Sequence, residues 1–123
     1  MWGLHKILFY KDPKGNEPVL DFIRELSRNN DKDSRVNLNN INDYIQMLSK
    51  YGTKIGEPYI KHLDGEIWEI RPLRNRIFFV AWVDGSYVLL HQFIKKSQKT
   101  PKREIEQAKR ELAFLKESGE DNE

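Results

Sequence analysis

Cationic side chains gather in the second half of the sequence in a pattern suited to contacting phosphate. Arg71 and Arg76 flank a short connection between two strand-like runs. From His91 to Arg103 there are five cations and no acid, namely Lys95, Lys96, Lys99, Lys102 and Arg103. Guanidinium and ammonium groups bind phosphate oxygens, and an imidazole can exchange a proton near neutral pH. A charge cluster alone is more often a solvated face, so the elements that carry these residues decide whether they converge.

The composition limits the kinds of site that this cluster can form. The chain has no cysteine, and His5, His62 and His91 are too scattered for a zinc motif, so we expect function without a metal or a cofactor. Its 123 residues, 38% of them hydrophobic, suffice for one core. No apolar run approaches the roughly 20 residues that span a bilayer, and the first residues lack the apolar stretch of a secretion signal. We therefore expect a cytoplasmic protein that does not enter a membrane.

The first half of the chain predicts one strand followed by two helices. The run 4–10 is rich in apolar and aromatic residues and ends at turn formers, so it favours a strand. A helix follows, with Asn16 as its cap, Pro18 in its first turn and apolar residues at helical spacing. A second helix begins near Ser34 and ends at Gly52, a residue suited to a C-cap.

The second half predicts a sheet and a terminal helix. Three runs dense in β-branched and aromatic residues predict consecutive strands at 67–71, 77–83 and 87–93. Asp84 and Gly85 separate the last two runs and predict a tight hairpin. An amphipathic helix follows Pro101, and we expect the acidic tail 118–123 to be disordered. The expected fold is a single α+β domain over 1–117, with element order β-α-α-β-β-β-α and a mainly antiparallel sheet.

The hairpin register sorts the candidate residues onto two faces of the sheet. If the hairpin has a two-residue loop, Phe78 lies opposite His91. Arg76 then lies opposite Phe93. Alternate pairs share a face, so one face is almost wholly apolar and forms the core. The other face carries these four side chains, with Lys95 continuing the row.

The short connection before the hairpin leaves the register of the preceding strand uncertain by one residue. Pairing Leu73 with Arg76 is the only register that buries the apolar residues of that strand. It places Arg71 and Glu69 on the polar face. Cations then surround exposed aromatic side chains, an arrangement that suits single-stranded RNA, whose bases stack and whose phosphates are clamped.

Three segments carry a resemblance to a known family. They are 61–71, with the pattern K-x-L-x-G-x-x-W-E-x-R, then 76–79, and 88–101, with the pattern L-H-x-F-x-K-K-x-x-K-T-P. Along these segments the chain resembles HigB-type toxins and their phage-derived relatives in the RelE superfamily. The resemblance covers nearly the whole chain.

The resemblance implies a RelE-like, microbial RNase-type fold and a ribosome-dependent mRNA endonuclease. The implied reaction is attack of an RNA 2′-hydroxyl on the adjacent phosphate without a metal ion. The implied partners are a HigA-type helix-turn-helix antitoxin, which neutralises the toxin, the ribosome and mRNA. The catalytic residues expected from the resemblance are Arg71, Arg76, His91 and Lys96. The expected RNA-binding residues are Lys61, His62, Phe93, Lys95 and Lys99.

These residues also have plainer interpretations. His91 is the candidate base and His62 the reserve, although a histidine in a strand is more often a structural hydrogen-bonding residue. The two arginines could instead form salt bridges with Glu69 or Glu66 at the rim of the sheet. For the whole protein, the alternatives are a non-enzymatic toxin that binds a protein target such as DNA gyrase, and a phage-derived binding protein.

Overall fold

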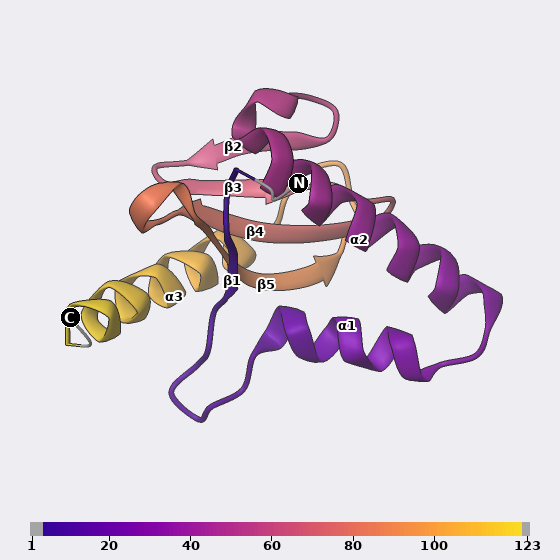
Figure 1. The fold of residues 1–123 in the computed structure, drawn as a ribbon, viewed down its shortest axis with the longest axis horizontal. Coiled ribbons are helices and arrows are strands. Elements are labelled where there is room, and N and C mark those ends of the chain that lie inside the picture. Colours follow the sequence, from indigo (N-terminus) through magenta and orange to yellow (C-terminus); the bar gives the residue numbers. More distant parts are fainter. Residues whose placement is uncertain (1–3, 122–123) are drawn as a thin grey trace.

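One five-stranded sheet runs through the computed structural model, which describes residues 4–121 (Figure 1). Its strand order is β1-β5-β4-β3-β2. β1 lies parallel to β5, and the other neighbouring strands are antiparallel. The strands are β1 (Ile7–Phe9), β2 (Ile60–Asp64), β3 (Ile67–Ile70), β4 (Asn75–Ala81) and β5 (Tyr87–Ile94).

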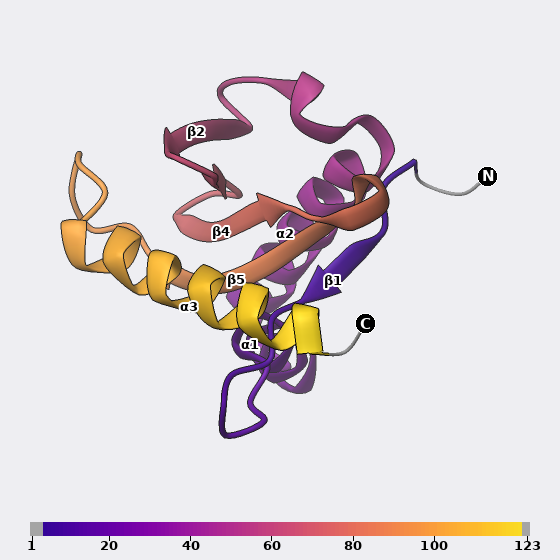
Figure 2. The ribbon, with the colours of Figure 1, turned by 90° about the vertical axis from the view of Figure 1, so that its left-hand side faces the viewer.

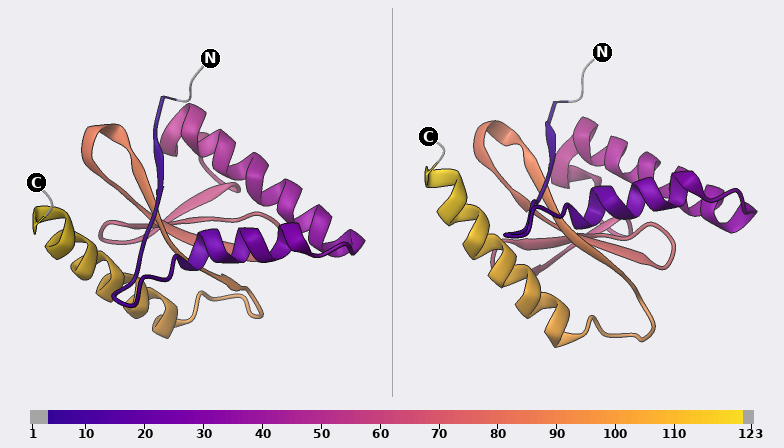
Figure 3. Two further views of the ribbon diagram at one scale, coloured as in Figure 1. Left: turned by 60° about the horizontal axis from the view of Figure 1, so that its bottom comes forward. Right: turned by 90° about the horizontal axis from the view of Figure 1, so that it is seen from below.

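Helices cover both faces of this sheet. α1 (Pro18–Arg28) and α2 (Lys32–Tyr51) lie against one face, and α3 (Lys102–Asp121) crosses the other. Figure 2 shows α3 in front of β5 with α1 and α2 behind, and Figure 3 shows the same separation from below.

Two hydrophobic cores result, one on each face, so the prediction of a single core is wrong. The core beneath α1 and α2 includes Val19, Ile41, Leu48, Ile77 and Phe79. The core beneath α3 includes Phe78, Val80, Leu90, Ala108 and Leu112. Because β4 alternates between the two cores, both faces of this central strand are buried, which accounts for the continuous apolar run at 77–81.

The α+β class, the mainly antiparallel sheet and the three helices predicted from the sequence are confirmed, but the order of elements is not. The sequence does not predict β2, and the observed order is β-α-α-β-β-β-β-α. Two adjacent polar residues, Lys61 and His62, break the alternation that indicates a strand. A register shift between His62 and Asp64 disturbs it further.

The helix ends agree with the sequence in part. Gly52 follows α2 as predicted, with a φ of 65°, and its N–H donates to the Leu48 carbonyl. Glu17, rather than the predicted Asn16, is the N-cap residue of α1. α3 runs through Asp121, beyond the predicted start of the acidic tail, and residues 122–123 of that tail lie outside the described residues.

The β4–β5 hairpin has the predicted turn but a different register beside it. Both turn residues, 84–85, have positive φ angles. Ala81 lies opposite Tyr87, one residue from the predicted pairing. An irregularity further along the ladder restores the predicted pair of Arg76 and Phe93.

The β3–β4 register also differs from the prediction, without changing the faces. Glu69 lies opposite Phe78, two residues from the predicted pairing. A shift of two residues leaves every side chain on its original face. Glu69 therefore shares a face with Arg76, as the sequence predicts.

Gly52 and Gly65 lead to a prediction about the same substitution at two positions. Both have φ in the left-handed region, where alanine is strained by about 1–2 kcal/mol. A Cβ on Gly52 would also lie 2.7 Å from His5 Nε2 and 2.8 Å from Tyr87 Oη, whereas nothing lies within 4 Å of one on Gly65. We expect Gly65→Ala to lower the free energy of unfolding in urea by about 1–2 kcal/mol and Gly52→Ala by about 2–5 kcal/mol. Equal losses would contradict the packing described at the end of α2.

Candidate functional site

A buried glutamate lies at the centre of the cationic cluster. The Glu69 side chain is 1% exposed, and its Oε2 lies 3.3 Å from Arg71 Nε. Lys61 of β2 lies directly opposite it in the sheet. Burial raises the pKa of Glu69 above its usual value, although the positive charges of Arg71, Arg76, Lys95 and Lys61, in that order, oppose this rise. One carboxylate thus lies among four cations, which come from β2, the end of β3, β4 and the segment after β5.

Two backbone carbonyls hold one end of the Arg76 guanidinium group. The residue is only 8% exposed. Its Nη1 donates to the carbonyls of Leu73 at 3.0 Å and Asn75 at 2.8 Å. Its buried Nε has no hydrogen-bond partner among the described residues. A buried donor without a partner is costly, and because the Nε itself is covered, Arg76 can meet an anion only through the part of its side chain that lines the pocket.

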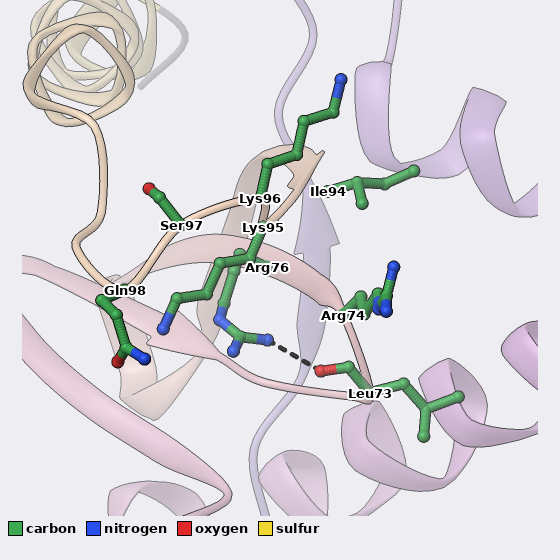
Figure 4. Close-up of a pocket in the computed structure, with 8 residues that line it drawn as sticks. All are labelled: Leu73, Arg74, Arg76, Ile94, Lys95, Lys96, Ser97 and Gln98. Carbon is green, nitrogen blue, oxygen red and sulfur yellow. Dashed lines mark hydrogen bonds between the residues drawn. The ribbon is translucent and has the colours of Figure 1, made fainter.

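A pocket of about 630 Å³ opens beside Arg76. It lies between the β3–β4 connection and the segment that follows β5, and Figure 4 shows the residues that line it. The side chain of Lys95 runs beside Arg76, whereas that of Lys96 points the other way. No acidic residue is among those lining it, which are Leu73, Arg74, Arg76, Ile94, Lys95, Lys96, Ser97 and Gln98.

Burial and neighbouring positive charges affect the pKa values of the cations in this pocket. Desolvation lowers the pKa of Lys95, and the positive charges of Arg76 and Arg71 lower it further. Burial likewise lowers the pKa of Arg76. Positive charges held this close to one another favour the entry of an anion.

A second cavity of about 840 Å³ continues the basic surface toward α3. Phe93 contributes to it, and the Phe93 ring packs edge-on against Phe78 at a centroid distance of 5.3 Å. Its cations include the predicted Lys96 and Lys99, and Glu104 is its one acidic lining residue. The two cavities share Ile94, Lys96 and Ser97. Together these adjoining cavities have room for a short length of a phosphodiester chain.

The expectation that His91 is exposed beside the arginines is wrong. The residue is 4% exposed, with Nδ1 2.6 Å from Glu111 and Nε2 3.0 Å from Glu104. Phe78, expected to be an exposed aromatic, is fully buried. α3 causes both differences, because its apolar residues pack on this part of the sheet and its carboxylates occupy both imidazole nitrogens.

His62 also lies apart from the cluster. It pairs with Trp68, so it projects from the face opposite to that of Lys61 and Glu69. Its Nε2 lies 2.6 Å from the Gly65 carbonyl, and its ring packs on Trp68. The sheet therefore brings together Arg71, Arg76, Lys95 and Lys61, but neither histidine.

Two residues of the site receive no functional role in the sequence analysis. Glu69 is correctly predicted on the same face as the arginines, but only as their salt-bridge partner and not as a buried residue at the centre of the cluster. Arg74, which lies in the short connection between β3 and β4, lines the pocket and is not among the predicted site residues. Its proximity to Lys96 depends on how two distant loops meet, which strand periodicity does not reveal.

A comparison with protein families identifies the family of this chain. Residues 21–113 match the family described as "Phage derived protein Gp49-like (DUF891)". The chain belongs to this phage-derived Gp49-like family, which is compatible with a toxin of a toxin–antitoxin system. The match includes every residue of the cationic cluster. No curated protein gives a significant match.

Two further observations concern the described part of the chain. Within residues 4–121, no helix is both long and apolar enough to cross a membrane. The same residues contain no group of three or more histidine, cysteine or acidic side chains that could hold a metal ion.

The contacts of His91 predict a pH-dependent contribution to stability. Burial opposes its protonation, but the carboxylates of Glu111 and Glu104 outweigh burial and raise the pKa. The folded state therefore binds this proton more tightly than the unfolded state, where the pKa is about 6.5. Its stabilisation is fully present below that value and is lost as the pH rises through the folded pKa.

We expect His91→Gln to lower the free energy of unfolding by about 3 kcal/mol or more near pH 6, because the buried Glu111 and the partly buried Glu104 lose their cation. The difference from the parent protein should narrow as the pH rises through the raised pKa of His91 in the folded state. Denaturant unfolding at several pH values measures it, with the exposed His62→Gln as the control. Parallel curves for the parent and His91→Gln would show that His91 does not carry this proton.

Proposed function

We propose that this protein is the toxin of a type II toxin–antitoxin system and that it is an endoribonuclease that cleaves mRNA on the ribosome. The Gp49-like family is compatible with a toxin, and the α+β fold with an antiparallel sheet is compatible with the RelE-like, microbial RNase-type fold. The family assignment alone does not select an activity. The choice of RNA as the substrate rests on the site.

The observation that carries the proposal is the excess of cations around one buried carboxylate at the edge of an open pocket. Glu69 compensates only one of the four charges that act on it. The pocket beside Arg76 has no acidic lining residue, and Arg74, Arg76, Lys95 and Lys96 all line it. A phosphodiester supplies the missing negative charge and accepts hydrogen bonds from a guanidinium group. Exposed Leu73 and Ile94 beside it offer apolar contact to a base.

The proposed reaction needs charge stabilisation more than covalent chemistry. The RNA 2′-oxygen bonds to the adjacent phosphorus while the bond from phosphorus to the 5′-oxygen breaks, giving a 2′,3′-cyclic phosphate and a 5′-hydroxyl. Arg76 and Arg71 would stabilise the negative charge that develops on the phosphoryl oxygens. Lys95, which lies beside Arg76, would add its positive charge to this stabilisation, and water would accept the 2′-hydroxyl proton. A proton from water would reach the departing 5′-oxygen.

We assign no proton transfer to His91, because both of its nitrogens are occupied beneath α3. The open site would then lack a strong base and an enclosed cleft that orients the substrate. Correct orientation can contribute about 7–11 kcal/mol to lowering a barrier. In this proposal the ribosome orients the substrate by holding the mRNA.

A neutralising partner follows from the same surface. We propose a HigA-type helix-turn-helix antitoxin with an acidic segment that covers Arg74, Lys95 and Lys96, since opposite charge steers association. Co-expression with the adjacent gene product followed by pull-down should recover a complex whose stability falls as salt is raised. A neighbouring product that leaves the protein free at low salt would contradict this partner.

Arg71→Lys is the substitution that best separates arginine geometry from charge. Lysine keeps the charge but loses the planar group that can bind phosphate with two donors. We expect a loss of about 10²–10³-fold in cleavage rate on mRNA-programmed ribosomes and a loss of growth inhibition. Arg76→Lys should lose as much activity, but it also breaks two backbone hydrogen bonds, so a fall in stability of about 1–3 kcal/mol should accompany it.

Arg24→Lys is the matched control for this experiment. Arg24 lies on α1 in an exposed pair with Asp21, away from the cluster, so its substitution should leave growth inhibition unchanged. If Arg71→Lys and Arg76→Lys both fold and remain fully toxic, the site is misplaced. A non-enzymatic toxin that binds a protein target would then be the better interpretation.

A further inference from the structure

We infer that Glu69 is a positioning residue of the phosphate site, which holds Arg71 and organises the neighbouring cations for an RNA phosphate. The inference rests on the proposed function for its substrate. Glu69 itself is too deeply buried to touch RNA, since only 1% of its side chain is exposed. Its effect must pass through the groups that contact it.

The contacts of Glu69 define what it can position. Arg71 Nε lies 3.3 Å from Oε2, while the Arg71 side chain is 21% exposed, so this arginine joins the buried carboxylate to the surface. Thr100 Oγ1 donates to Oε1 at 3.5 Å. Thr100 follows the loop that carries Lys95 and Lys96 and precedes α3. One carboxylate thus contacts both sides of the basic surface, the end of β3 and the loop after β5.

A positioning role and a purely electrostatic role for Glu69 predict opposite changes in RNA binding when the residue is replaced. If Glu69 acted only as a negative charge, it would weaken the attraction of the cluster for phosphate, and its removal would strengthen RNA binding. If Glu69 positions the cations, its removal frees Arg71 and lets four mutually repelling charges move apart. RNA binding would then weaken although the site becomes more positive. The sign of the change therefore distinguishes the two roles.

Glu69→Gln keeps the shape of the side chain and removes its charge. Glu66→Gln is the matched control, because it removes one negative charge at the end of the β2–β3 hairpin, where Glu66 forms an exposed pair with Lys116. Three quantities are measured for each variant: solvent exchange of the Arg71 Nε–H by NMR, affinity for a short single-stranded RNA oligonucleotide, and cleavage of mRNA on programmed ribosomes. Thermal unfolding confirms that each variant is folded.

We expect Glu69→Gln to lose protection of the Arg71 Nε–H, to bind the oligonucleotide about 10-fold more weakly and to cleave about 10²-fold more slowly, since a misplacement near 1 Å can have that effect. Glu66→Gln should retain protection, binding and cleavage. Glu69→Asp keeps the charge but shortens its reach, so it should show intermediate values. It also tests the inference if Glu69→Gln does not fold, because parental binding and Arg71 protection in Glu69→Asp would overturn it.

The outcomes separate this inference from the proposed function. Unchanged or tighter RNA binding by folded Glu69→Gln would overturn the positioning role, as would parental cleavage by that variant. If the parent protein cleaves no mRNA while Glu69→Gln still frees Arg71 and weakens oligonucleotide binding, the positioning role stands and the nuclease proposal is wrong.

Discussion

Burial of the Glu69 carboxylate is the constraint on which the arrangement of the basic surface depends. An ionised carboxylate removed from water is strongly unfavourable unless cations and hydrogen bonds surround it. Four cations at one end of a sheet would in turn repel one another without an anion among them. Glu69 meets both conditions, because it draws on Arg71, Arg76, Lys95 and Lys61. The excess positive charge remains available on the open side, beside Arg76.

α3 determines how much of this sheet face stays open. Its residues Ala108 and Leu112 pack over Phe78, and its carboxylates enclose His91. The helix begins only at Lys102, after a loop that leaves the end of β5 accessible. The available surface is therefore a basic margin of the sheet, and not the broad aromatic and imidazole surface that the strand pattern predicts.

Properties that depend on residues close in sequence could be predicted, and those set by distant packing could not. Helical spacing, the hairpin turn and the faces of the strands follow from local pattern, and strand parity even survives a register error of two residues. For that reason Arg71 and Arg76 could be placed with Glu69. β2 could not be predicted, because it depends on pairing with β3 and contains a register irregularity. The environment of His91 could not be predicted either, because two carboxylates 13 and 20 residues further along the chain determine it.

The measurement that tests the central claim most directly is a map of transcript ends after brief induction of the protein in cells, with and without a block of translation. The account predicts new 5′-hydroxyl ends inside coding regions, paired with upstream 2′,3′-cyclic phosphates, that disappear when ribosomes cannot engage the mRNA. Growth arrest without any new transcript ends would contradict it. So would the same ends at undiminished frequency when translation is blocked.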